Sequence, residues 1–496
     1  MSVRRRASAA GLFCALILLL APRAGVAGGA GEGRVLWPAD GVPLVTAAGL
    51  QGEPHLASDG AGGAFAAWTD CRNSFTQCDI YGQHVSADGA RLWGANGLGV
   101  GVTMNADSGP RLASDGAGGV YVAFITSQQT DSWVRLAYLD AAGRSQWVGS
   151  WPWLTIDQGI GVRAVAQLLP DGAGGVFVIW YARADPAGDD GNLFAQRVSF
   201  NGVLQWATAT TITAAPGDQY DARAALDGAG GFLVAWADAR DPNDQNLYAQ
   251  RVSAGGQPLW TLHGVLVTYD ASLQRMGPLV TDGAGGAFLA WYDFRSNGHT
   301  ADVYMQRITS DGQRAWAADL AIATGDPAAE GPADLVSDGR GGAILFLTSA
   351  VSPEAATEVD VLAQRVNAAG DLLWGPQPVN VTPWLDQQDF PVAVADRQGG
   401  AYVAWIDKGS DPTAYDVWAQ HVAADGALQW PGRGVQVVGA PGAQESLAMI
   451  DSGPFAAMIA WQDGRTTPDA PDIYAQRVGD VLSRAYLPVV ELSSHE

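Results

Sequence analysis

The sequence Asp-Gly-x-Gly-Gly recurs along the chain at a nearly fixed spacing, and this period limits the fold more than any other feature. Full copies begin at Asp59, Asp115, Asp171, Asp227, Asp282 and Asp338, and weaker copies begin at Asp396 and Asp451. Successive copies lie 55 to 58 residues apart. A constant period over eight copies indicates one supersecondary unit that packs against copies of itself.

Each unit predicts four short strands. The first strand ends at the Asp-Gly turn, where glycine supplies the positive backbone angles of a tight hairpin. The second, such as Phe232 to Trp236, is apolar on both faces and is typical of a strand buried between sheets. The third alternates, as in Tyr248 to Val252, and we expect the fourth to carry a tryptophan. That tryptophan recurs as Trp37, Trp93, Trp147, Trp206, Trp260, Trp316, Trp374 and Trp430.

The two ends of the repeated region complement each other. The residues after Trp37 match those after Trp260, so the chain begins with a fourth strand that has no sheet of its own, while the eighth unit ends near Val478 without such a tryptophan. Closing a ring would satisfy both ends and remove exposed sheet edges. We therefore expect an all-β, eight-bladed β-propeller over residues 28–482, with four antiparallel strands per blade, closed by the N-terminal strand. The segment Ala485 to Leu487 is an alternative occupant of the same edge.

The first 27 residues have the pattern of a secretory signal peptide. Arg4 to Arg6 precede an apolar stretch from Leu12 to Ala21, and small residues follow up to Ala27. This stretch is shorter than the roughly 20 residues that a membrane span needs. We expect a secreted, periplasmic or cell-surface protein with no membrane span after signal cleavage, and we assign no role to the tail, residues 483–496.

Cys71 and Cys78 are the two cysteines outside the signal peptide, and they lie in one predicted loop. In an exported protein such a pair is expected to form a disulfide. A metal site would need further soft ligands nearby, and the six histidines of the chain do not cluster with these cysteines.

The charge of the chain is strongly acidic. Without the four arginines of the signal peptide, 24 basic residues stand against 51 acidic ones, and Lys408 is the only lysine. Binding to a phosphate backbone depends on clustered Lys and Arg, so we expect no nucleic-acid partner. The 63 glycines and 26 prolines also exclude a mainly helical protein. We expect a monomer.

The repeat resembles a known type. The combination of Asp-Gly-x-Gly-Gly, an apolar strand, Tyr-Ala-Gln-Arg-Val and a glycine turn resembles the delta-sixty tandem repeat of secreted bacterial proteins, over almost the whole mature chain. This resemblance implies a surface scaffold without an established reaction. The ending Ala369 to Trp374 is also similar to the docking repeat of pyrroloquinoline-quinone-type propellers, but their adjacent cysteines are missing. A sialidase Asp-box would separate Ser58 from Asp59 by one residue.

An aspartate and an arginine two positions apart follow the second strand in several units. Residues two apart on an extended chain share a face, so each pair can form an ion pair within its own blade. The alternative is a ring of carboxylates at one end of the propeller that binds calcium, the only cofactor that the sequence leaves open. The pairs are Asp70 and Arg72, Asp238 and Arg240, Asp293 and Arg295, and Asp463 and Arg465, with Asp407-Lys408 as a variant.

Three tryptophans outside the repeated positions are candidate binding residues: Trp133, Trp151 and Trp153. Trp151-Pro152-Trp153 lies between the second and third units, where two rings form either a stacking platform for a sugar or peptide, or a cover for a thin part of the core. The second and sixth units also lack the Trp-x-Asp sequence, so a specific partner could be recognised there.

The connections between units argue against catalysis. From each repeated tryptophan to the next turn aspartate there are 21 to 24 residues in every unit, and common hydrolase and phosphate-binding motifs do not occur. We predict a non-catalytic scaffold that binds a protein or a glycan. The alternative is an extracellular carbohydrate-active enzyme with carboxylates at the channel mouth, and quinone-dependent oxidation ranks third. A specific pocket predicts unrepeated polar residues that meet at one place, whereas a scaffold predicts repeated polar rings.

Overall fold

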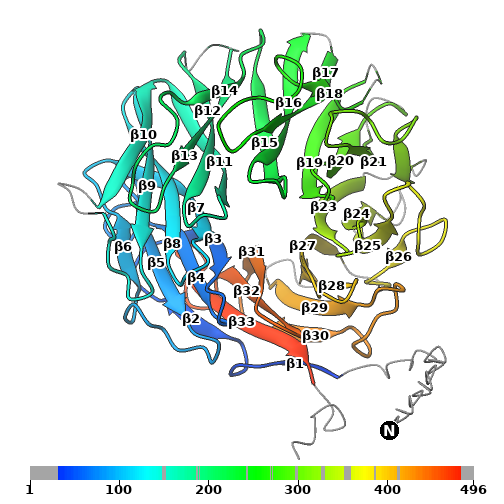
Figure 1. Ribbon diagram of the computed structural model, residues 1–496. Coiled ribbons are helices and arrows are strands. Elements are labelled where there is room, and N and C mark those ends of the chain that lie inside the picture. The colour runs from blue at the N-terminus through cyan, green and yellow to red at the C-terminus, as the bar shows by residue number, and fades with distance from the viewer. Residues whose placement is uncertain are drawn as a thin grey trace, which may run out of the picture.

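The chain forms eight four-stranded antiparallel sheets arranged as blades around a central axis (Figure 1). The computed structural model describes residues 32–147, 152–185, 188, 190–241, 244–268, 270, 272–296, 300–324, 330–350, 359–384, 387–409 and 414–481. The prediction of an eight-bladed β-propeller is confirmed. The predicted signal peptide, the tail and the segment Ala485 to Leu487 lie outside the described residues. Within the described ranges, no helix is both long and apolar enough to cross a bilayer.

Each blade begins at the axis and runs outward, and we number the blades 1 to 8 from β3 onward. Neighbouring innermost strands contact each other around the axis (Figure 1). The innermost strands are β3 (Gln51–Ser58), β7 (Ala106–Ser114), β11 (Val162–Pro170), β15 (Gln219–Leu226), β19 (Gln274–Thr281), β23 (Glu330–Ser337), β27 (Gln388–Ala395) and β31 (Gln444–Asp451). The second strands are β4 (Ala64–Asp70), β8 (Val120–Gln128), β12 (Val176–Arg183), β16 (Phe232–Asp241), β20 (Ala287–Asp293), β24 (Ala343–Ala350), β28 (Ala401–Asp407) and β32 (Ala456–Asp463).

The outer half of each blade consists of a regular third strand and a shorter fourth one. The third strands are β5 (Asp79–Val85), β9 (Asp131–Leu139), β13 (Asn192–Val198), β17 (Asp244–Val252), β21 (Asp302–Ile308), β25 (Val359–Val366), β29 (Asp416–Val422) and β33 (Asp472–Asp480). The fourth strands are β6 (Leu98–Gly101), β10 (Trp153–Ile160), β14 (Thr210–Thr213), β18 (Val265–Leu266), β22 (Leu320–Ala323), β26 (Val379–Asn380), β30 (Val435–Val438) and, for blade 8, β2 (Val42–Val45).

The second strands form the centre of the core, as their unbroken apolar sequences predict. Apolar clusters join adjacent blades, so that side chains of β16 pack with those of β20 between blades 4 and 5. The tryptophans that end these strands are at most 1% exposed, which confirms their assignment to the core: Trp68, Trp180, Trp236, Trp291, Trp405 and Trp461.

The other repeated tryptophans do not lie on the fourth strands, and this part of the prediction is wrong. Trp260 comes in the connection between β17 and β18, five residues before β18 begins at Val265. A fully buried side chain holds this connection: the Oε1 atom of Gln250 accepts a hydrogen bond from the Trp260 backbone NH (2.9 Å), and its Nε2 atom donates to the Thr261 carbonyl (3.0 Å). A glutamine amide thus replaces sheet pairing at this point.

These tryptophans join each blade to the next. The indole NH of Trp206 donates to the carbonyl of Ala254 in blade 4 (3.1 Å), and its ring packs against Gly256, where a Cβ atom would lie 2.7 Å from the indole. Gly256 also has a φ of 80°. A larger residue would therefore both clash with the indole and adopt a strained backbone conformation. The same indole-to-carbonyl bond joins Trp37 to Ala87, Trp93 to Ala141, Trp147 to Phe200, Trp260 to Ser310, Trp316 to Ala368, and Trp374 to Ala424.

The turn aspartates form a second link between blades. The Oδ1 atom of Asp227 accepts hydrogen bonds from the backbone of its own turn, and Oδ2 accepts one from Arg251 Nε (2.9 Å). Arg251 in turn donates to Ser310 in the next blade (3.1 Å). In blade 8 the turn position belongs to Ser452, which accepts a hydrogen bond from Arg477 (2.8 Å), and not to Asp451 as the sequence repeat suggests.

The ring closes as predicted, because the N-terminal strands complete the last blade. Strand β1 (Gly33–Val35) and β2 both pair with β33, so that the first and last strands lie side by side (Figure 1). The backbone NH of Trp37 donates to Gln476 Oε1 (3.0 Å), the same glutamine contact as in other blades. Described strands thus occupy both halves of the β33 edge.

The junction between blades 7 and 8 uses a carboxylate where other junctions use a backbone carbonyl. Asp480 accepts hydrogen bonds from Trp430 Nε1 (2.7 Å), the Tyr402 hydroxyl (2.6 Å) and His421 Nδ1 (3.2 Å), and His421 Nε2 lies 2.9 Å from Asp396. The two carboxylates outweigh burial and raise the pKa of His421 to about 9. The hydrogen bonds and the charge of His421 also lower the pKa of Asp480 and of Asp396.

Blade 2 departs from the pattern in a way that also affects blade 3. Its outermost strand, β10, has eight residues and reaches into the space that connecting loops occupy elsewhere. From this strand Asp157 accepts hydrogen bonds from the Trp180 indole (3.1 Å) and from Arg163 Nε (2.6 Å) of blade 3. Blade 3 has Ala182 where other blades carry the aspartate of Trp-x-Asp, so its neighbour supplies the missing carboxylate.

Candidate functional site

The predicted Asp and Arg pairs lie at the end of each second strand and bind each other. In blade 4 the carboxylate of Asp238 is fully buried and accepts four hydrogen bonds, one from the Trp236 indole (2.8 Å) and three from Arg240. The guanidinium of Arg240 lies 3.6 Å above the ring of Tyr248. The same arrangement holds Asp70 with Arg72, Asp293 with Arg295, and Asp463 with Arg465. Each pair therefore fixes the end of its own blade.

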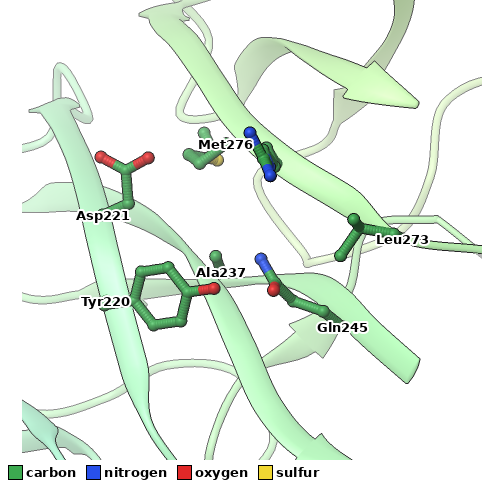
Figure 2. Close-up of a pocket in the computed structure, with 7 residues that line it drawn as sticks. Tyr220, Asp221, Ala237, Gln245, Leu273 and Met276 are labelled. Atoms are coloured by element: carbon green, nitrogen blue, oxygen red, sulfur yellow. The ribbon is translucent and has the colours of Figure 1, made fainter. Parts of the chain in front are cut away.

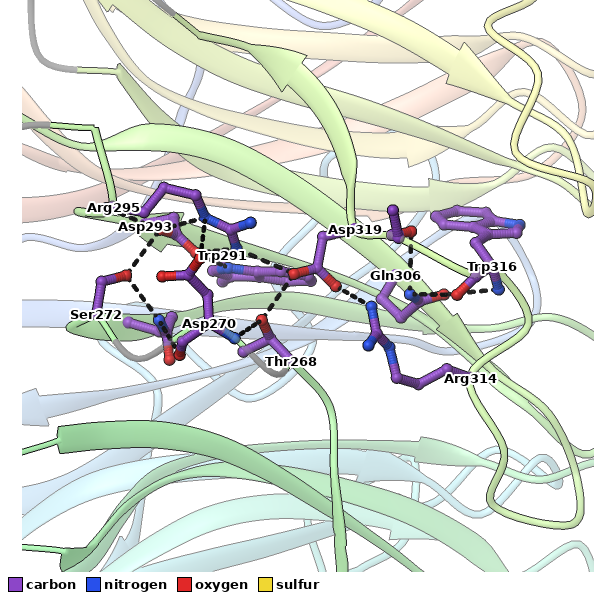
Figure 3. Close-up of polar contacts among 12 residues, drawn as sticks. Thr268, Asp270, Ser272, Trp291, Asp293, Arg295, Gln306, Arg314, Trp316 and Asp319 are labelled. Atoms are coloured by element: carbon purple, nitrogen blue, oxygen red, sulfur yellow. Dashed lines mark hydrogen bonds and ion pairs between the residues drawn. The ribbon is translucent and has the colours of Figure 1, made fainter.

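In blade 5 this arrangement extends into a wider network (Figure 3). Arg295 also donates to Asp319 (3.0 Å), which pairs with Arg314 (2.6 Å) and accepts a hydrogen bond from the Thr268 hydroxyl (2.7 Å). The hydrogen bonds from Arg295 and Trp291 outweigh burial and hold the pKa of Asp293 below its usual value. A carboxylate with this many donors is a structural anion.

The structure shows no metal centre at the acidic loops. Within the described ranges, no three side chains of His, Cys, Asp or Glu gather closely enough to hold a metal ion. Asp189, a carboxylate in the loop after β12, lies outside those ranges. Calcium binding therefore stays a prediction.

The three unrepeated tryptophans do not meet at one place. Trp133 is half-buried on β9, with Arg135 5.5 Å from its ring centroid. Trp153 begins β10 and packs edge-on against Phe124 at 6.1 Å, at the border of the core between blades 1 and 2. Trp151 lies outside the described residues. Cys71 and Cys78 form the predicted disulfide, with their Cα atoms 4.2 Å apart.

A large cavity lies at the axis. It has a volume of about 1120 Å³, and residues of blade 1 and of blades 3 to 8 line it. Most of these residues belong to the innermost strands, so seven blades contribute to one space. A cavity of this size suits a ligand of several linked rings.

One position of the innermost strand carries seven residue types in the eight blades, and most of its residues line this cavity. This position lies four residues before the turn aspartate, or before Ser452 in blade 8. We call these eight residues the channel ring: His55, Arg111, Gln167, Arg223, Pro278, Asp334, Val392 and Ala448. Six of them line the cavity directly, all except Arg111 and Ala448. Blades 1 to 4 contribute hydrogen-bond donors, whereas blades 5 to 8 contribute three apolar residues and one carboxyl group.

His55 and Arg111 form a polar pair in the donor half of the channel ring. A guanidinium nitrogen of Arg111 donates to His55 Nε2 (2.7 Å). Burial and the charge of Arg111 lower the pKa of His55 to about 3, so the imidazole is neutral. Because Nε2 accepts a hydrogen bond, the proton lies on Nδ1, which is a donor.

Asp334 is the carboxyl group of the opposite half. Its side chain accepts hydrogen bonds from the backbone NH groups of Ala393 and Leu335, both at 2.8 Å. Burial raises the pKa of Asp334, and these two hydrogen bonds offset only part of that effect.

Blade 7 places an exposed aromatic ring and the only lysine at the cavity wall. Phe390 is 62% exposed and has a φ of 52°, the left-handed region that a bulky residue rarely adopts. Lys408 lies 3.2 Å from Asp389, and its ammonium is 5.5 Å from the Phe390 centroid and 5.7 Å from that of Tyr415. In blades 1, 4 and 8 the residue that replaces Phe390 also has positive φ, but it is polar: Glu53, Asp221 and Ser446.

Tyr292 adds a second aromatic wall from blade 5. Its ring packs against Gly331 of the next blade, where a Cβ atom would lie 2.5 Å from the ring. Burial, together with Asp221 and Asp389, raises the pKa of Tyr292. Glycine at position 331 therefore allows this phenol to lie along the cavity.

A smaller pocket of about 310 Å³ opens between blades 4 and 5 and shares Met276 with the central cavity (Figure 2). Figure 2 shows Tyr220, Asp221 and Gln245 on one side and Leu273 and Met276 on the other. Gln245 donates to the carbonyl of Gln274 (3.0 Å), which joins the two blades beside this pocket. This pocket therefore lies next to the central cavity.

The repeated motifs and isolated tryptophans of the sequence do not predict the channel residues, because the channel ring has no motif. A signal was nevertheless present, since comparison of the eight units position by position shows one place in the first strand with seven residue types in eight copies. The protein thus contains both patterns: repeated polar pairs at the ends of the second strands, and unrepeated polar residues at the axis.

Comparison with known proteins identifies no family for this chain. No protein-family model matches the chain, and no curated protein matches its sequence. Solved structures similar to it include a protein of unknown function from Dyadobacter fermentans, with 10% identity, a TM-score of 0.40, and coverage of 62% of this chain and 92% of that chain. A prolyl endopeptidase matches at 12% identity and a TM-score of 0.45 over 83% of this chain and 53% of its own. An ulvan lyase matches at 11% identity and a TM-score of 0.39 over 87% and 94%.

Proposed function

We propose that this protein binds an oligosaccharide in its central cavity without transforming it. The observation that carries this proposal is the contrast between repeated and unrepeated positions. The repeated polar groups bind each other within the blades, whereas the cavity collects one-off residues from seven blades, including the exposed ring of Phe390. Planar rings beside hydrogen-bonding side chains are the surfaces on which sugars stack and bind.

The dimensions of the site favour a glycan over a protein partner. Standard protein interfaces bury about 800 Å² on each partner and are formed by extended surfaces. Here the unrepeated residues instead line a concave space of about 1120 Å³ at the axis. The proposal includes a secreted or cell-surface location, for which residues 1–27 give the sequence support.

The test is calorimetric titration with a panel of neutral and acidic oligosaccharides. We expect binding to the wild-type protein and at least ten-fold weaker binding to Phe390→Ala, because a stacked ring contributes on the order of 1 kcal/mol or more. The matched control is Phe200→Ala, since Phe200 is 61% exposed but lies in the turn after β13, away from the axis. Equal loss in both variants, or no binding of any oligosaccharide, would contradict the proposal, and the second result would favour a protein partner.

A second candidate function rests on two carboxyl groups in different environments. Asp334 is held by backbone NH groups and has a raised pKa, whereas Asp389 pairs with Lys408, and all three residues line the cavity. Two carboxyl groups in different environments are the arrangement that glycoside cleavage uses. Release of reducing ends from a bound oligosaccharide, abolished by Asp334→Asn, would establish this activity in place of simple binding.

A further inference from the structure

We propose that the saccharide is acidic, and that the donor half of the channel ring binds its carboxylate or sulfate group. This inference rests on the proposed function and specifies its ligand. The donor half consists of His55, Arg111, Gln167 and Arg223, on four successive blades. Three of the four line the cavity, and the fourth, Arg111, is hydrogen-bonded to one of them.

The first argument is the supply of donors. Arg223 presents a guanidinium, Gln167 an amide, and His55 an imidazole whose Nδ1 carries the proton because Nε2 accepts from Arg111 (2.7 Å). An oxyanion accepts several hydrogen bonds at once, and guanidinium groups match carboxylate and sulfate geometry. Donors on three blades that face one cavity are suited to an anionic group.

The second argument is the charge on Arg111. Within the described ranges no carboxylate lies within ion-pair distance of this guanidinium, whose hydrogen-bond partners are His55 and the carbonyl of Pro110 (3.0 Å). Burial and the charge of Arg223 lower the pKa of Arg111. Two cations that repel each other in a partly buried place are stabilised by an anion bound between or beside them.

Arg223 has a partner of its own, but an exposed one. It pairs with Asp221 two residues earlier at 2.8 Å, with both side chains more than 40% exposed. Such exposed pairs are weak, and a bound oxyanion can displace them. The positive charge of Arg223 is therefore available to a bound anion.

The net charge of −23 does not oppose this assignment. Charges on the outer surface are screened over about 8 Å at physiological salt. The channel residues act at contact distance within a cavity, where the local groups decide which ligand is bound. The acidic surface would instead slow the approach of a long polyanion, so short acidic oligosaccharides are the appropriate probes.

The experiment compares ligands that differ only in charge. Tetragalacturonate and its methyl ester have the same backbone, and a sulfated galactose tetrasaccharide with its unsulfated form provides the second pair. We expect the full-length protein to bind an acidic member at least ten-fold more tightly than its neutral counterpart. The pair that shows the difference identifies carboxylate or sulfate as the group recognised, and competition by free sulfate tests the anion site alone.

Variants then locate the site. We expect Arg223→Gln to weaken binding of the acidic ligand about ten- to hundred-fold and to leave binding of the neutral one unchanged. Arg111→Gln should weaken the acidic ligand as well, and Arg111→Lys should restore part of the loss by keeping the charge. The control is Arg144→Gln, which removes an arginine whose side chain is 78% exposed in the turn after β9.

The outcomes separate this inference from the proposed function. Equal binding of charged and neutral ligands, with no effect of Arg223→Gln, would overturn the inference while the proposed function stands. Binding of no saccharide would overturn both. Because Arg111 is partly buried, the thermal midpoint of each variant is measured first, and the exposed Arg223 carries the decision if Arg111→Gln does not fold.

Discussion

The body of the blades and the channel ring differ in whether their residues and contacts repeat from blade to blade. In the blade body, the same contacts recur: a buried glutamine holds a tryptophan, the tryptophan packs on a glycine of the next blade, and a buried aspartate binds an arginine. In the channel ring, on the innermost strands, seven residue types occupy eight positions. The comparison teaches that the repeated contacts hold the blades together, and that the residues of the proposed binding site are the ones that do not repeat.

Removal of the closing strands should have the largest effect. A chain that begins at Ala47 loses β1 and β2, including Trp37 and the fully buried Leu44 and Val45. At roughly 1.5 to 3 kcal/mol for each buried apolar side chain, the loss is about 5 to 10 kcal/mol. We expect a protein that unfolds at much lower urea or aggregates through the open edge of β33, as measured by urea titration and size-exclusion chromatography. Truncation after Val481 is the control, and equal midpoints would contradict ring closure by these strands.

Truncation of a repeated core tryptophan should have the next largest effect. Trp236→Ala leaves a cavity between blades 3 and 4 and removes the indole donor of Asp238, so we expect a loss of about 3 to 5 kcal/mol of unfolding free energy. Trp236→Phe keeps part of the ring and should cost less. Urea denaturation followed by circular dichroism measures both. A loss below about 1 kcal/mol for the alanine variant would mean that the repeated layer does not carry the stability.

The junction between blades 7 and 8, where Asp480 replaces a backbone carbonyl, predicts a pH dependence of stability. The pKa of His421 is raised from 6.5 to about 9, so its protonated form stabilises the folded state fully below pH 6.5, and this contribution falls as the pH rises through 9. The shift corresponds to at most about 3 kcal/mol. Asp396 and Asp480 have lowered pKa values, so their contribution is instead lost in acid, below their unfolded value of 3.8.

The test is the thermal midpoint of wild type and His421→Arg between pH 6 and pH 10. Arginine occupies this position in blades 3 to 6 and stays charged, so the variant should lose less stability than wild type across this range. His84→Arg is the matched control, because His84 Nδ1 meets the carbonyl of Ala141 rather than a second carboxylate. Parallel pH profiles for wild type and His421→Arg would show that this junction does not titrate as described.

A channel substitution should have the smallest effect on stability. Phe390→Ala removes a side chain that is 62% exposed and holds no blade together, so we expect a change within about 0.5 kcal/mol, the same as for Phe200→Ala. Urea denaturation of both variants measures this. A loss above 1.5 kcal/mol for Phe390→Ala alone would mean that the channel layer also supports the fold.

The sequence predicts the architecture well because its signals are local and repeated. The turn aspartates and their glycines mark each first hairpin, and the match between Trp37 and Trp260 predicts closure. It misplaces the second set of tryptophans, since a side-chain contact from Gln250, and not strand pairing, fixes them. It also misplaces the last turn by one residue, because Asp451 resembles the motif while Ser452 makes its contact.

The channel ring is harder to predict for a physical reason. Its residues meet only after eight blades have closed, and nothing local in the sequence distinguishes His55 or Arg223 from other residues of a first strand. Backbone bulges at Glu53, Asp221 and Phe390 also shift the alternation, so a simple in-and-out pattern assigns these side chains to the wrong face. The sequence predicts the Asp and Arg pairs because they repeat. They repeat because each pair fixes the end of the second strand in its own blade.

The pairing of β1 and β2 with β33 has a consequence for biosynthesis. The backbone NH of Trp37 binds the side chain of Gln476, which is synthesised 439 residues later. A nascent chain therefore keeps its first strands unpaired until translation is almost complete, and a chain cut short before residue 472 has no β33 to receive them. Only a chain that includes β33 can pair with β1 and β2 and so cover the last sheet edge. Shorter products keep exposed strands and stay susceptible to proteases and to association with one another.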